Sequence, residues 1–160
     1  MGSTLDLLRR LTEAKVDYVL VGGMAAIAHG ASTVTEDADI CINFDLATLT
    51  AAFKALEPLH PRQRMNPAKP PLGTDPAPFV GYKNLYLLTD DGVLDLLGEV
   101  VAVGGYERVA ARAVELDLGA FRCRVMGLDD LIECKRALGR PKDVRAAAEL
   151  DRVRARVQPK

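Results

Sequence analysis

Two aspartates, Asp37 and Asp39, stand two residues apart in a mostly apolar segment that runs from Asp37 to Ile42. In a strand, alternate side chains share one face, so these carboxylates would project together with Cα atoms about 6.7 Å apart. Like charges on an apolar surface repel each other and resist the loss of water. A divalent cation such as Mg²⁺ removes both costs, because it prefers carboxylate oxygens as ligands. The pair therefore predicts a metal site on a strand.

A third acid, Asp95, interrupts a second apolar segment, Val93 to Leu97. If its strand lies beside that of Asp37 and Asp39, three carboxylates would form one cluster. Each acid also has a plainer interpretation. Asp37 would cap the start of a strand, Asp39 would be a solvated residue on an edge strand, and Asp95 would belong to the shoulder of a hairpin.

A glycine pair, Gly22 and Gly23, separates the apolar segment from Tyr18 to Val21 from a run of helix-forming residues that ends near His29. Backbone without side chains can approach an anion, and a helix that starts there presents free N–H groups. These features suit a triphosphate, although Gly-Gly is also an ordinary tight turn. Neither a following Lys-Ser/Thr nor a third spaced glycine is present, which argues against a Walker loop and a dinucleotide fingerprint.

The pattern of apolar residues, caps and turn signals predicts an α/β (α+β) fold with a short mixed β-sheet flanked by helices and a C-terminal helical pair. The Asp91-Gly92 signal predicts a hairpin. The predicted helices span 4–14, 24–29, 46–56, 106–113, 128–138 and 141–156, and the predicted strands span 18–21, 37–42, 82–88, 93–97, 113–117 and 121–125.

The middle of the chain is rich in proline: seven of the nine prolines fall between Pro58 and Pro78. The segment has no periodicity, which predicts a long surface loop, partly polyproline-like. It would be either a tolerated insertion or a flap over a substrate.

The composition fits one compact unit of 160 residues, with a core at 1–127 and a helical extension at 128–160 packed on it. A net charge of −1 excludes a strongly basic nucleic-acid coat, although the extension has an excess of basic residues. No apolar stretch is long enough to span a membrane, and three separated cysteines indicate neither a disulfide framework nor a zinc ribbon. We expect a cytoplasmic protein without membrane contact.

The order Gly22-Gly23, Asp37-x-Asp39 and a later acid resembles the DNA polymerase beta-like nucleotidyltransferase superfamily. Two stretches of the chain are similar to the abortive-infection toxin (AbiE type) and related minimal nucleotidyltransferases within it. They are Val19 to Ile40, and the C-terminal segment from Asp130 to Asp143. The proline-rich middle has no counterpart in this resemblance, and relatives often carry Arg where Thr33 stands.

The resemblance implies a transferase that uses an NTP and Mg²⁺, or Mn²⁺, to move a nucleoside monophosphate to a hydroxyl acceptor. Asp37, Asp39 and Asp95 would be the catalytic and metal-binding residues, and Asp95 would also help to deprotonate the acceptor. Gly22 and Gly23 would line the triphosphate. The acceptor would be RNA, such as a tRNA end, or a protein, and a cognate toxin or antitoxin is an expected partner.

Two alternatives stay open at this point. The first is a nucleotide-binding or antitoxin-like interaction module with little catalysis, which the loss of a guanidinium at Thr33 would favour. The second is a small-molecule nucleotidyltransferase of the aminoglycoside type. The slightly basic C-terminal segment argues against the second, because such enzymes need an acidic drug-binding pocket.

Further candidates surround this set. Lys135 would reach a nucleotide phosphate or lie on a solvated helix face. Lys142 would pair with Asp143 or, as the resemblance implies, face the active cleft as a second nucleotide-binding lysine. His29 would act as a base or cap the end of a helix. Tyr82 and Tyr86 would stack on a base or pack in the core.

Overall fold

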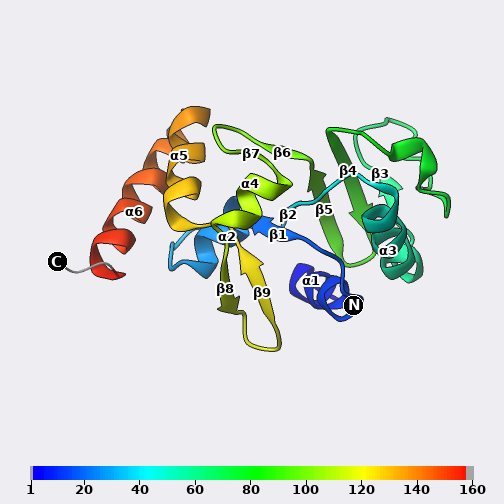
Figure 1. Ribbon diagram of the computed structural model, residues 1–160, viewed down its shortest axis with the longest axis horizontal. Helices are drawn as coiled ribbons and strands as arrows, with labels where there is room; N and C mark the ends of the chain where they lie inside the picture. Colours follow the sequence, from blue (N-terminus) through cyan, green and yellow to red (C-terminus); the bar gives the residue numbers. More distant parts are fainter. Residues whose placement is uncertain (1, 158–160) are drawn as a thin grey trace.

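The computed structural model describes residues 2–157 and confirms the α/β class, with helices packed around a mixed sheet (Figure 1). The α-helices are α1 (Thr4–Glu13), α2 (Gly22–Ala28), α3 (Leu46–Leu56), α4 (Tyr106–Ala111), α5 (Leu128–Leu138) and α6 (Pro141–Val157). The strands are β1 (Val19–Val21), β2 (Ala38–Cys41), β3 (Arg62–Gln63), β4 (Asn84–Thr89), β5 (Gly92–Leu97), β6 (Glu99–Val100), β7 (Gly104–Gly105), β8 (Val114–Asp117) and β9 (Arg122–Val125). Two short 3₁₀ helices, η1 (Glu57–Leu59) and η2 (Ala77–Phe79), lie in the proline-rich segment.

The main sheet has seven strands in the order β3-β4-β5-β2-β1-β9-β8. β2 runs parallel to β5 and antiparallel to β1, while β4 and β5 form the antiparallel hairpin that the Asp91-Gly92 signal predicts. The two acid-bearing segments of the sequence are therefore neighbouring strands at the centre of the sheet. A separate two-stranded ribbon, β6–β7, follows β5 and is absent from the prediction.

Alternation along the central strands separates a packed face from an open one. On β2 and β5 the small and apolar residues Ala38, Ile40, Leu94 and Leu96 are fully buried in the core. Their neighbours Asp39 and Asp95 point to the opposite face, because side chains alternate along a strand. The core thus fixes which way the two acids point.

The first helix is anchored at its N-terminal end and along one side. Ser3 and Asp6 form a capping box at its start. Leu7, Leu8 and Leu11 recur on one side of the helix and are fully buried, and α1 packs against α3 and β5. This packing supports the sheet from the face away from the acids.

The C-terminal helices pack on each other, and α5 also contacts α2. α5 ends at Gly139, whose φ of 67° is the left-handed conformation that glycine adopts easily. α6 then begins at Pro141, the predicted first position. Figure 1 shows this pair at one end of the molecule and α3 at the other, with the central strands between them.

The proline-rich segment is more than a surface loop. It adds β3 to the edge of the sheet beside β4, and Arg62 also forms an isolated bridge with Pro71. Proline is tolerated at such an edge because its missing N–H faces no further strand. The segment therefore extends the sheet, which the loop prediction did not include.

Two further predictions can be compared directly with the structure. Cys41, Cys123 and Cys134 are buried free thiols, which agrees with the expectation from their spacing that they form no disulfide framework. Within residues 2–157, none of the helices combines the length and apolar character that crossing a membrane requires.

Candidate functional site

A row of cross-strand neighbours forms the centre of the site. Asp39 on β2 lies in register with Asp95 on β5, and Asp95 in turn pairs with Tyr86 on β4. On its other side Asp39 pairs with Val21, the last residue of β1. In-register neighbours share a face of the sheet, so the structure brings Asp39 and Asp95 together as predicted.

The chain turns from β1 into α2 directly beside Asp39, at Gly22. Gly22 has a φ of 69°, and a Cβ built there would lie 2.4 Å from Oδ2 of Asp39. Only glycine leaves room for that carboxylate and adopts this backbone conformation at low cost. The structure starts the helix at Gly22 itself, two residues earlier than predicted, and Gly23 faces the methyl group of Thr35.

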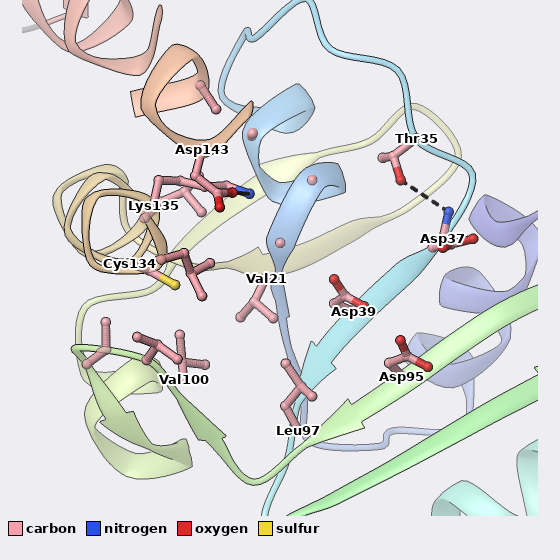
Figure 2. A pocket seen from close by; sticks show the side chains of 18 of the residues that line it. Val21, Thr35, Asp37, Asp39, Asp95, Leu97, Val100, Cys134, Lys135 and Asp143 are labelled. Atoms are coloured by element: carbon pink, nitrogen blue, oxygen red, sulfur yellow. Dashed lines mark hydrogen bonds and ion pairs between the residues drawn. The ribbon is translucent and has the colours of Figure 1, made fainter. Parts of the chain in front are cut away.

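Asp37 lies one residue before β2 and is exposed at the entrance to the site. Its backbone N–H donates to Oγ1 of Thr35 at 3.3 Å. Figure 2 shows its side chain on the same side of the pocket as Asp39 and Asp95. Asp37 is therefore near enough to the pair for its charge to act on both acids, although it lies outside the strand pairing.

The acids influence each other electrostatically. Burial, followed by the negative charges of Asp95 and Asp37, raises the pKa of Asp39 to about 6, against a lowering by Lys135 and Arg64. Burial also raises the pKa of Asp95, although its hydrogen bond to Arg64 opposes that shift. The folded protein thus holds negative charge at a place where a cation would be favourable.

Arg64 is a part of the site that the sequence did not reveal. Its Nη2 donates to both Oδ1 and Oδ2 of Asp95, each at 2.7 Å, and its guanidinium lies 5.6 Å from the ring centre of Tyr86. It follows β3 directly, in the proline-rich segment. No motif marks it, because its contact with Asp95 spans 31 residues of chain.

The opposite wall of the site is basic and comes from α5 and α6. Lys135 on α5 places Nζ 3.7 Å from Oδ1 of Asp143 on α6, and the Asp143 side chain is 1% exposed. Arg140 donates from Nε to Oδ2 of Asp143 at 2.5 Å, and this hydrogen bond lowers the pKa of Asp143. Asp143 therefore pairs with Arg140 and Lys135, and it holds the lysine at the wall. Lys142 is exposed and also lines the cavity.

A cavity of about 970 Å³ lies between these walls. Figure 2 shows Asp37, Asp39 and Asp95 on one side and Lys135 with Asp143 on the other, with Val21 between them. All the predicted site residues line this cavity: Gly22, Gly23, Asp37, Asp39, Asp95, Lys135 and Lys142. Thr33 lines it as well. Acidic and basic groups facing each other suit a ligand that carries phosphate together with a cation.

The donor set fits a divalent ion in part. Asp37 and Asp39 offer carboxylate oxygens, the chemistry that Mg²⁺ prefers, and Gly22 keeps Asp39 unobstructed. Asp95 is already paired with Arg64. Among residues 2–157, no group of three or more His, Cys, Asp or Glu side chains has the arrangement of a metal site. The three-carboxylate cluster therefore stays a prediction.

Other candidates lie elsewhere or play structural roles. His29 is the C-cap of α2 through its backbone N–H, while Nε2 of its ring lies 2.8 Å from the carbonyl oxygen of Met126, outside that helix. It does not line the cavity of the acids. Tyr82 is exposed and packs edge-to-face on Phe79, so only Tyr86 faces the cavity. The stacking prediction does not apply to the two tyrosines as a pair.

In comparisons with known proteins, the chain matches no family model, and no curated protein is similar enough to count as a relative. The function must therefore be argued from the geometry of the site.

Proposed function

We propose that the protein is a Mg²⁺-dependent nucleotidyltransferase that moves a nucleoside monophosphate from an NTP to a hydroxyl acceptor. One observation carries the proposal: Asp39 and Asp95 are in-register neighbours beside the side-chain-free Gly22, in a cavity with Lys135 on its far wall. Paired carboxylates near an open backbone, facing a fixed cation, can bind a triphosphate together with a metal.

Each wall of the cavity would have its own role. Asp37 and Asp39 would hold Mg²⁺, which would supply charge neutralisation on the phosphates during in-line attack. Lys135, fixed by Asp143, would add a positive charge from the far wall, and Lys142 would add a second at the rim. Gly22 and Gly23, which line the cavity beside the acids, would line the triphosphate. Orientation and charge would account for most of the catalysis.

RNA, such as a tRNA end, or a protein is the proposed acceptor. The segment 128–160 has nine basic and six acidic residues, and such an excess attracts a phosphate backbone. A toxin or antitoxin partner and a cytoplasmic location are part of the same proposal.

The direct test is transfer of label. The purified protein is incubated with each α-³²P-labelled NTP, Mg²⁺, cellular RNA and protein extract, and labelled products are separated by size. We expect one class of acceptor to become labelled. Asp39→Asn should abolish the label, whereas Asp17→Asn, which neutralises a side chain that is 79% exposed outside the cavity, should retain it. Absence of label with every NTP and acceptor, or full activity of Asp39→Asn, would refute the enzyme.

A second candidate is a nucleotide-binding module with little catalysis. The observation in its favour is the pairing of Asp95 with Arg64, which occupies the third acid. Calorimetric titration with ATP, GTP, CTP and UTP in the presence of Mg²⁺ distinguishes the two. Binding without labelled product would favour the module, and binding with transfer would favour the enzyme.

A further inference from the structure

Arg64 is held in place by the backbone of the proline-rich segment. Its N–H donates to the carbonyl oxygen of Tyr86 at 2.9 Å, which continues the β3–β4 pairing by one residue. The N–H of Gln63 donates to the carbonyl oxygen of Pro70 at 2.9 Å. The segment thus folds back on itself and fixes the position from which Arg64 extends. Arg64 is a built feature of the sheet edge and not a chance contact of a loose loop.

The side chain of Arg64 crosses one strand to reach Asp95. It passes over the ring of Tyr86 and ends with Nη2 at 2.7 Å from both carboxylate oxygens. The pair is largely shielded, with exposed fractions of 29% for Arg64 and 13% for Asp95. Both carboxylate oxygens of Asp95 therefore already accept a hydrogen bond from a cation of the chain itself.

The charges around the acids indicate what this pairing does. Asp37, Asp39 and Asp95 together carry three negative charges when ionised, and Arg64 compensates one of them. Two negative charges are left, which one divalent cation neutralises. A second divalent ion at Asp95 would have to displace a guanidinium that has two short contacts and a stacking partner.

We infer that Arg64 takes the place of a second metal ion at Asp95, so that the resting protein binds a single divalent ion through Asp37 and Asp39. Arg64 is then a positioning residue that sets the ion capacity of the site. This inference rests on the proposed function for the assignment of the first ion. It adds that the second ion site opens only when Arg64 leaves Asp95.

The test counts Mn²⁺ bound by the full chain in equilibrium dialysis at pH 7.5, without nucleotide or acceptor. We expect one Mn²⁺ per chain for the wild type and two for Arg64→Gln. The double variant Arg64→Gln/Asp95→Asn should return to one. Arg62→Gln is the matched control, because it removes the same charge two residues away, on β3, and it should stay at one.

A second variant keeps the test decisive if Arg64→Gln fails to fold, which circular dichroism would show. Asp95→Asn alone should leave the single Mn²⁺ bound with its affinity unchanged within about threefold, while Asp39→Asn should lose it. The inference would be overturned if the wild type bound two ions or none, or if the wild type and Arg64→Gln bound equal numbers. Loss of the ion in Asp95→Asn would also overturn it.

The inference and the proposed function fail separately. If no acceptor is ever labelled but Arg64→Gln gains an ion, the inference about Arg64 is supported and the proposed transferase activity is refuted. If transfer proceeds but Arg64→Gln gains no ion, only the role of Arg64 is wrong.

Discussion

Asp39 makes the stability of the metal-free protein depend on pH. Its pKa is raised to about 6 by burial and by the neighbouring acids, so the folded state holds the proton more tightly than the unfolded state. Stability is then highest near and below the ordinary aspartate pKa and falls as the pH rises through about 6. The full cost of ionisation is at most about 3 kcal/mol.

Asp39→Asn should therefore be more stable than the wild type at pH 8 by about 1–3 kcal/mol, and nearly equal to it at pH 4. Urea unfolding at both pH values in EDTA measures the difference. Asp17→Asn, at an exposed position, serves as the control and should change little. A less stable Asp39→Asn at pH 8 would contradict the assigned cause of the pKa shift.

Gly22 is the second residue whose identity the geometry dictates. Gly22→Ala is unfavourable for two reasons. An alanine with a φ of 69° is strained, and its Cβ would lie 2.4 Å from Oδ2 of Asp39. We expect a loss of about 2–4 kcal/mol in unfolding free energy, from backbone strain of about 1–2 kcal/mol and displacement of the carboxylate.

Gly81→Ala isolates the backbone part of this cost. Gly81 has a φ of 82°, but a Cβ there would meet no atom within 4 Å. Urea unfolding should show only the strain in Gly81→Ala, about 1–2 kcal/mol. Equal losses in the two variants would mean that the contact with Asp39 carries no energy.

At the scale of elements, the strands that carry the acids follow from local pattern, and the remainder of the site does not. Alternation and the Asp-Gly turn signal predict the β4–β5 hairpin and the segment of β2. β3 has two residues among prolines, and its partners, such as Leu88 for Arg62, lie far away in sequence. Such a strand is stabilised by its neighbours and has no pattern of its own. Arg64 was therefore beyond prediction. Lys135 and Lys142 were candidates from the sequence, but the pairing of Asp143 with Lys135 and Arg140, instead of the predicted Lys142, depends on how the two helices pack.

The junction of α5 and α6 depends on Asp143. This acid is 1% exposed and accepts hydrogen bonds from Nε and Nη2 of Arg140, with Lys135 at 3.7 Å. Asp143→Asn should cost about 2–4 kcal/mol in unfolding free energy, because it leaves the charge of Lys135, which is 14% exposed, without its partner. Chemical denaturation monitored by circular dichroism gives the value.

Asp151→Asn is the comparison on the same helix. Asp151 pairs with Arg136 and Arg154, and its side chain is 33% exposed, so its loss should cost no more than about 1 kcal/mol. Equal costs at the two positions would show that Asp143 is not a special link between the helices.

At the scale of the whole molecule, the cavity lies between the sheet and the C-terminal helices. The sheet supplies Asp37 and Asp39, and the C-terminal helices supply Lys135 and Lys142. A nucleoside triphosphate with Mg²⁺ would bridge the two walls, since its phosphates attract the lysines and its cation attracts the acids. A ligand that binds only the folded state raises the melting temperature as its concentration rises.

We expect the melting temperature of the wild type to increase with the concentration of the preferred NTP and Mg²⁺, by about 5–10 °C at one hundred times the dissociation constant. Differential scanning fluorimetry measures the shift. Asp39→Asn should lose the dependence on Mg²⁺, and Lys135→Met should lose the dependence on the nucleotide while its response to Mg²⁺ alone stays. Because each variant changes one wall only, a shift that survives in both would place the nucleotide outside this cavity.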